Sequence, residues 1–98
     1  MTKYFLYRIY CGGKIPDSET KISKNLLRKT LKKFKPIVKG WTIVEGEGHW
    51  NDIDEPSYIV ELGLPNPFYA MEIALIYKLT YRQDSVMVVI PNNECIFV

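Results

Sequence analysis

The stretch that decides the fold is WTIVEGEGHWNDIDEPSYIVELGL, residues 41–64. Residues 41–50 and 57–64 are rich in β-branched and aromatic side chains, which is typical of strands. The polar run NDIDEP lies between them and indicates a hairpin connection. We therefore predict two neighbouring antiparallel strands in this stretch.

A strand and a helix are predicted ahead of this hairpin. Residues 4–11 alternate with a period of two, and Gly12 and Gly13 end the run. Ser23 is a candidate N-cap for a helix whose apolar residues recur at helical spacing until Pro36 stops it. This helix is amphipathic, and its polar side is basic.

A second helix and a further strand are predicted after the hairpin. Asn66 followed by Pro67 is a good helix start, and we expect this helix to run to about Arg82. Residues 85–90 follow as a strand. The turn after them allows a short edge strand at residues 94–98.

The predicted order is β-α-β-β-α-β within a single domain, residues 1–98. Right-handed crossovers turn this order into a ferredoxin-like α+β sandwich, in which both helices cover one face of an antiparallel sheet. Because charged side chains avoid the core, the strand positions that alternate with charges are assigned to the helix side. These positions are Phe5, Tyr7, Ile9, Val44, Tyr58, Val60 and Leu62. The open face is expected to carry Tyr4, Leu6, Arg8, Tyr10, Trp41, Ile43, Glu45, Glu47, His49, Ile59 and Glu61.

The composition is that of a globular protein, with 47% hydrophobic and 24% charged residues. No stretch approaches the roughly 18 uninterrupted apolar residues of a membrane span. The chain runs from Met1 and Thr2 into the first strand without an apolar leader, so we expect it in the cytoplasm, or in the cytoplasm of a host. Cys11 and Cys95 are too few for a disulfide scaffold, and we expect them to be free thiols.

The net charge of +2 hides a strong separation of charge along the chain. Residues 21–39 carry eight Lys and Arg residues and no acidic one, whereas residues 45–61 carry six acidic residues and no Lys or Arg. The basic face of the first helix consists of Arg28, Lys29, Lys32 and Lys33. This face either binds an anionic partner or is simply solvated. Nucleic acid is not favoured as a partner, because an RNA-binding sheet of this topology would carry a cationic side chain at the position that Glu61 occupies.

The run VEGEGHW, residues 44–50, concentrates side chains that could carry chemistry. Its glycines either let a ligand approach one face of the strand or mark a packing contact. The predicted ligand-binding residues are Arg8, Tyr10, Trp41, Glu45, Glu47 and His49. The alternative is a small dimeric α+β barrel enzyme, in which His49 or Glu47 carries a proton beneath Tyr10. No metal is expected, because alternate positions of one strand lie too far apart for a closed tetrahedral shell, and no cofactor is predicted.

The second helix is apolar around nearly its whole circumference, which is more than one sheet face can cover. We therefore predict a homo-oligomer, most simply a dimer. It would bury either the open sheet face, which we favour, or the outer side of this helix. That outer side is expected to include Tyr69, Ile73, Ile76 and Tyr77.

An aromatic first strand ending in CGG, then GWTIVEGEGHW, EPSYIVEL, QDSVMVV and ECIFV, resembles an uncharacterised bacterial and phage family of unknown function. The resemblance implies a small ferredoxin-like protein and no catalytic residues. The chain is also similar to small phage-encoded proteins, some of which inhibit host proteins or sequester nucleotide signals. The leading hypothesis is thus a non-enzymatic, oligomerising binding domain whose partner is an anionic, nucleotide-like small molecule or a host protein.

Overall fold

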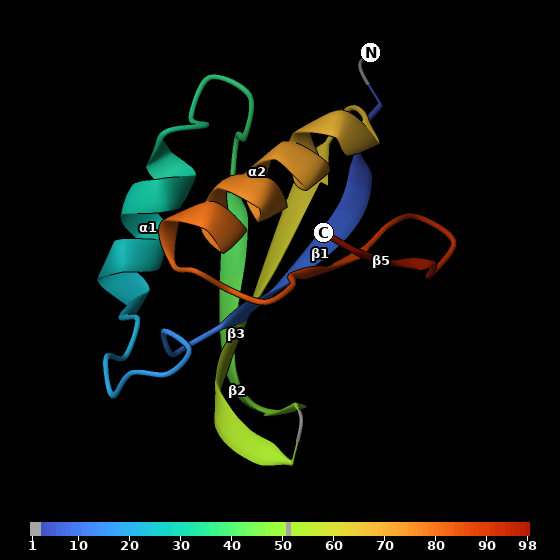
Figure 1. Cartoon of the computed structure of the whole chain (residues 1–98). Helices are drawn as coiled ribbons and strands as arrows, with labels where there is room; N and C mark the ends of the chain where they lie inside the picture. The colour runs from blue at the N-terminus through green and yellow to red at the C-terminus, as the bar shows by residue number, and fades with distance from the viewer. Residues whose placement is uncertain (1–2, 51) are drawn as a thin grey trace.

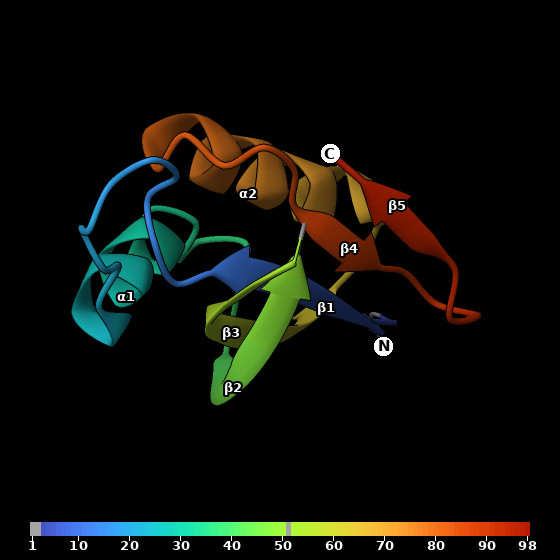
Figure 2. The same ribbon diagram turned by 60° about the horizontal axis from the view of Figure 1, so that its bottom comes forward.

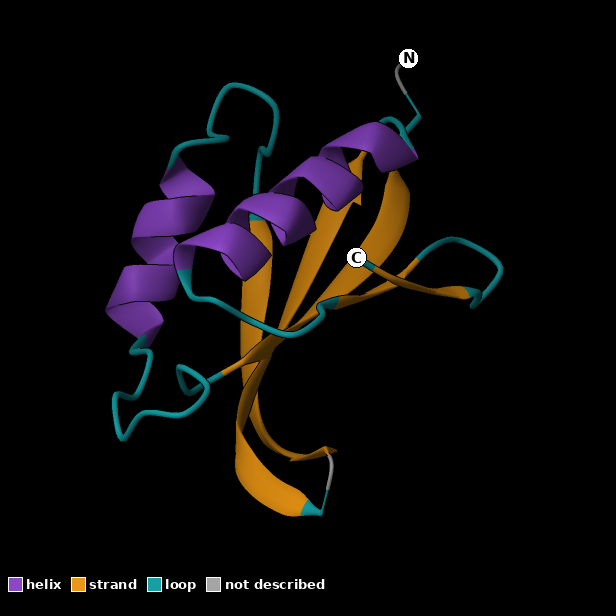
Figure 3. Cartoon of the chain, in the orientation of Figure 1, coloured by secondary structure: helices purple, strands orange, loops and turns teal. Residues whose placement is uncertain are grey.

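A central sheet flanked by two helices is seen in the computed structural model, which describes residues 3–50 and 52–98. The strands form a five-stranded sheet in the order β2-β3-β1-β4-β5, and every neighbouring pair is antiparallel. Both helices lie on one side of it (Figures 1 and 3). The elements are β1 (Phe5–Gly12), α1 (Lys24–Lys32), β2 (Trp41–Trp50), β3 (Ile53–Leu64), α2 (Pro67–Thr80), β4 (Met87–Val89) and β5 (Cys95–Phe97). The predicted ferredoxin-like α+β sandwich is confirmed, including the fifth strand at the edge.

Local signals place both helix starts as predicted. The Ser23 hydroxyl accepts a hydrogen bond from the backbone N–H of Leu26, and the Asn66 side chain accepts one from that of Phe68. The helix ends come slightly earlier than expected. The second helix stops at Thr80, and Arg82 then adopts a positive φ of 50°, which turns the chain toward β4.

The core lies between the sheet and the helices. Leu27 and Leu31 of α1 and Ile73 and Tyr77 of α2 are almost fully buried against the strands. The helix-facing side of the strands contributes Tyr7, Ile9, Cys11, Val60, Leu62, Leu64 and Val88. This arrangement leaves the other sheet face without a helical cover (Figure 2).

The predicted faces are confirmed for β1 and β3, but the prediction for β2 assigns each of its side chains to the wrong face of the sheet. Trp41 pairs with Leu62 and Ile43 with Val60, so both lie on the helix side. Val44 lies on the open face and is 44% exposed. The error came from Glu45, which was assigned away from the helices because of its charge. In the structure Glu45 sits on the helix side at the edge of the sheet and reaches Lys24 Nζ at 2.8 Å.

The outer side of α2 also differs from the prediction. Ile73 and Tyr77 are 2% and 1% exposed, because they face the sheet. The apolar side chains that α2 presents to solvent are those of Phe68, Leu75 and Leu79. Within residues 3–50 and 52–98, no helix is long and apolar enough to cross a membrane.

Candidate functional site

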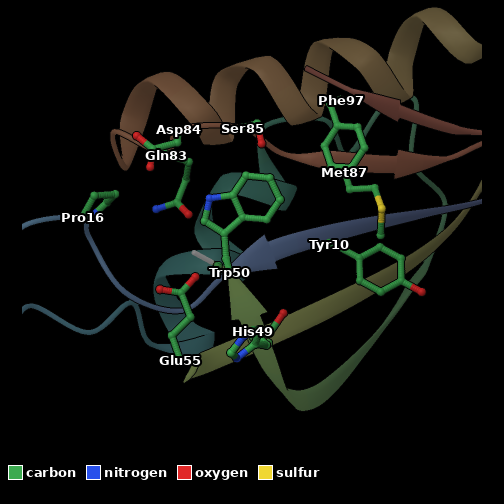
Figure 4. A pocket seen from close by; sticks show the side chains of 13 residues that line it. Tyr10, Pro16, His49, Trp50, Glu55, Gln83, Asp84, Ser85, Met87 and Phe97 are labelled. Atoms are coloured by element: carbon green, nitrogen blue, oxygen red, sulfur yellow. The ribbon is translucent and has the colours of Figure 1, made fainter. Parts of the chain in front are cut away.

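A pocket of about 370 Å³ lies on the open face of the sheet, beside the last residues of β1 (Figure 4). The pairing of β1, β4 and β5 places three side chains on the floor of this pocket. Tyr10 pairs with Met87 of β4, and Met87 in turn pairs with Phe97 of β5. Directly paired residues of antiparallel strands point to the same face, so these three side chains form a row across the open face.

The β2–β3 hairpin supplies the facing wall. The β1 strand ends at Gly12, opposite Ser57, but β2 and β3 continue pairing beyond that point as far as Trp50 and Ile53. We call the protruding part, residues 46–50 and 53–57, the arm. The arm curves so that the Trp50 ring comes within 6.3 Å of the Phe97 ring, centroid to centroid, at an interplanar angle of 34°. The two aromatic rings thus close one side of the pocket.

The glycines of the arm leave space rather than fit a packing contact. A Cβ atom added to Gly46 would meet nothing within 4 Å, and one added to Gly48 would make only ordinary contacts with Ser57. Both residues share a strand face with Trp50, and Gly48 lines the pocket. A close packing contact therefore does not require glycine at either position.

The inner end of the pocket is polar and carries negative charge. Glu55 comes from the arm, and Gln83 and Asp84 come from the turn between α2 and β4. Among the described residues that line the pocket, none is Lys or Arg. A pocket with an aromatic wall and two carboxylates suits a ligand that has a flat apolar part and a cationic or hydrogen-bond-donating part.

Tyr77 supports this end of the pocket from below. Its phenol donates a hydrogen bond to the carbonyl oxygen of Gly12, which is a lining residue. Burial of the ring, and secondarily the neighbouring Cys11 thiol, raises the pKa of Tyr77. Tyr77 is therefore a neutral hydrogen-bond donor at physiological pH, and its role here is structural.

The predicted binding residues are only partly brought together. Tyr10 lines the pocket. Arg8 lies on the same face, but it forms an ion pair at 2.8 Å with Glu61 on the neighbouring strand. Trp41 and Glu45 lie on the helix side of the sheet, away from the pocket.

His49 and Glu47 alternate with Gly48 and Trp50, so their side chains project from the other side of the arm. The imidazole Nδ1 of His49 lies 2.6 Å from Oδ1 of Asp54, its cross-strand partner, and His49 is among the residues that line the pocket. Glu47 borders a shallower hollow on the arm. Of the three residues of the alternative hypothesis, His49 and Tyr10 thus line the same pocket, whereas Glu47 does not.

The basic face lies apart from the pocket. All four of its residues are exposed on α1 and its C-cap, and α1 packs on the opposite side of the sheet; they are Arg28, Lys29, Lys32 and Lys33.

Within the described ranges, no group of three or more metal-binding side chains comes together.

Comparisons with known proteins find a match in structure and none in sequence. No family model and no curated protein matches the chain. A solved phage SAM lyase in complex with S-methyl-5'-thioadenosine superposes with a TM-score of 0.76 at 15% identity, covering 100% of this chain and 92% of that one. A phage SAM lyase in the apo state superposes with a TM-score of 0.65 at 16% identity, covering 96% and 87%. At these identities the similarity establishes a shared fold.

Several lining residues were missed by sequence reasoning. Trp50 had been read as part of the hairpin, and Glu55 as part of its connection. Gln83, Met87 and Phe97 lie in a turn and in short strands, where nothing in the local sequence indicates a binding site.

Proposed function

We propose that the open-face pocket binds an adenosine-bearing sulfonium or thioether compound, of which S-adenosylmethionine and S-methyl-5'-thioadenosine are the first candidates. The proposal rests on one observation. On a fold shared with phage SAM lyases, the open face carries a pocket that combines aromatic walls with carboxylates, and its described lining residues include no Lys or Arg.

The chemistry of the pocket suits such a compound in two ways. The Trp50 and Phe97 rings offer apolar surface on which an adenine base can stack. Glu55 and Asp84 offer negative charge to the sulfonium and ammonium groups of S-adenosylmethionine, and aromatic faces also attract cations. A nucleotide phosphate would meet repulsion from the same carboxylates.

The proposed ligand differs in charge from the ligand expected from the sequence. The nucleotide-like character is kept, but the ligand is neutral or cationic rather than anionic at this site. An anionic partner would instead bind the basic face of α1, on the other side of the sheet.

Isothermal titration calorimetry tests binding directly. S-adenosylmethionine and S-methyl-5'-thioadenosine should bind, and ATP should bind at least about tenfold more weakly because of its charge. Glu55→Gln should weaken S-adenosylmethionine more than the uncharged thioether. Glu72→Gln, an exposed change on α2, is the matched control and should alter neither affinity. Failure of both nucleosides to bind would refute the proposal.

A second candidate function is lyase activity on S-adenosylmethionine, favoured by the fact that the two solved structures described above are SAM lyases. Conversion of this sulfonium into methylthioadenosine breaks the bond between sulfur and the methionine-derived chain, and the electron pair of that bond neutralises the sulfur. The carboxylate of the same chain can attack the carbon that sulfur leaves, so that the chain departs as homoserine lactone and atoms and charge balance. Incubation with S-adenosylmethionine, followed by mass spectrometry for methylthioadenosine, separates the two functions. Product that accumulates in proportion to enzyme would show a lyase, whereas binding without product would show a sequestering protein.

A further inference from the structure

We infer that Gln83 makes the pocket selective for bases with an amino group on their edge, so that 6-amino purines bind in preference to 6-oxo purines. The inference rests on the proposed nucleoside binding and adds a specificity-determining residue to it. Gln83 lies in the turn between α2 and β4, lines the pocket, and is only 9% exposed.

Two hydrogen bonds fix the orientation of the Gln83 amide. Its Nε2 donates to the carbonyl oxygen of Lys14 at 3.0 Å and to that of Tyr81 at 3.0 Å. A side-chain amide nitrogen has two hydrogens, so both donors are used. Rotating the amide by half a turn would place Oε1 against two carbonyl oxygens, and this repulsion excludes the flipped state.

The acceptor oxygen is left for a ligand. Within residues 3–50 and 52–98, Oε1 of Gln83 has no hydrogen-bond partner, and no polar side-chain atom is both fully buried and unpaired. Oε1 is therefore an unpaired acceptor that retains contact with the pocket. Gly12 makes this position available, because a Cβ atom there would lie 2.3 Å from Oε1.

The pocket geometry brings the edge of a stacked base toward this oxygen. Figure 4 shows the amide end of Gln83 directed to the side of the pocket where the Trp50 indole lies. A base that stacks on Trp50 presents its edge, rather than its face, to groups beside the ring.

Glutamine commonly reads adenine with donor and acceptor together, but here the donors are already occupied. Oε1 can only accept, so it favours the exocyclic amino group of adenine. It opposes the carbonyl oxygen that hypoxanthine carries at the same position.

The first experiment uses the unmodified protein and a series of ligands. Calorimetry would compare S-methyl-5'-thioadenosine with its 6-oxo analogue, S-methyl-5'-thioinosine, and with the analogue that has hydrogen at position 6. We expect the 6-oxo analogue to bind at least about tenfold more weakly, with the 6-hydrogen analogue between the two. Removal of the 2'- or 3'-hydroxyl should change the affinity much less.

Each other outcome counts against the inference in a distinct way. Equal binding of the 6-amino and 6-oxo compounds would overturn it while leaving nucleoside binding intact. A loss centred on a ribose hydroxyl would also overturn it, since Oε1 would then face the sugar. Binding of none of the compounds would refute the proposed function itself.

Variants identify the residue responsible. Gln83→Met keeps the length of the side chain but removes the acceptor, so the preference for the amino group should fall to within about twofold. Gly12→Ala should displace Oε1 and reduce the preference by a second route. Glu72→Gln, an exposed change on α2 at a residue that does not line the pocket, is the control and should keep the full preference. Full preference in a folded Gln83→Met protein would overturn the assignment.

Discussion

Trp50 and Phe97 end the two strands that form opposite edges of the sheet, yet their ring centroids lie 6.3 Å apart. The contact is made across the open face, over the row that contains Tyr10 and Met87. The sheet is therefore curled and its arm bent so that the two edges meet through aromatic side chains. This contact turns a bare sheet face into a pocket.

Replacing either ring should weaken ligand binding more than it weakens the fold. Trp50 and Phe97 are 48% and 57% exposed, so we expect Trp50→Ala to lower the free energy of unfolding by only about 1 kcal/mol. Affinity for S-methyl-5'-thioadenosine should fall by about tenfold because a stacking surface is lost. Calorimetry and urea unfolding measure the two effects. Phe68→Ala, an exposed aromatic change on α2, should leave the affinity unchanged.

The two cysteines should react at very different rates. Cys11 is buried on the helix side of β1, and this burial raises the pKa of its thiol. Cys95 is exposed on the edge strand β5. Since the thiolate is the reactive form, iodoacetamide at pH 8 should modify Cys95 alone in the native protein and both residues in denaturant. Rapid labelling of Cys11 in the native state, or fewer than two thiols after denaturation without reductant, would contradict this expectation.

Stability should decline in alkali, and Tyr77 should contribute to the decline. Its pKa is raised in the native state, chiefly by burial, so between the unfolded and native pKa values the native protein holds the extra proton. The free energy of unfolding therefore falls as pH rises above about 10, the usual pKa of tyrosine. The raised pKa of Cys11 acts in the same direction from about pH 8.5.

Tyr77→Phe checks the contribution of the phenol. The variant loses the hydrogen bond to the Gly12 carbonyl, so its free energy of unfolding should be lower than that of the parent by about 1 kcal/mol at pH 7. It should also lose less stability than the parent between pH 7 and pH 11, as measured by urea unfolding. Tyr69→Phe, at a half-buried position on the same helix, serves as the control. An identical alkaline loss in Tyr77→Phe and the parent would show that another group is responsible.

The protein is expected to form a homodimer, as its uncovered apolar surfaces suggest. Light scattering at micromolar concentration should give about twice the chain mass of 11.4 kDa. Val44→Glu on the open face and Leu79→Glu on α2 each place a charge on one exposed apolar surface. Whichever change yields the monomer mass identifies the buried surface. A monomer mass for the parent at high concentration and low salt would contradict the prediction.

Local patterns predicted the order of the elements and both helix starts, because caps and turns act over a few residues. They did not predict that β3 begins at Ile53, inside the stretch expected to be the hairpin connection. Ser23 and Asn66 cap their helices as expected, and β2 has the bounds that its composition indicated. Local patterns did not reveal which side chains of β2 face the helices. A carboxylate at a sheet edge can pair with a lysine in solvent, so the charge of Glu45 did not reveal which side it occupies.

The site was less predictable than the fold, because contacts between distant segments build it. Tyr10 could be identified from the alternation of one aromatic strand. The proximity of Phe97 depends on two successive strand pairings, and that of Gln83 on how the chain leaves α2. No local motif contains that information.

The curled sheet also bears on when the pocket exists during synthesis. A ribosome delivers β2 and its arm early, but β5 comes after every other element of the domain. Chains grow from the amino terminus at a pace of about 5 to 20 residues per second, and a domain folds as a unit. Until Phe97 has emerged, Trp50 has no aromatic partner across the open face. A nascent chain would therefore bind the proposed ligand more weakly than the finished domain, and full affinity would be reached only once translation of the domain is complete.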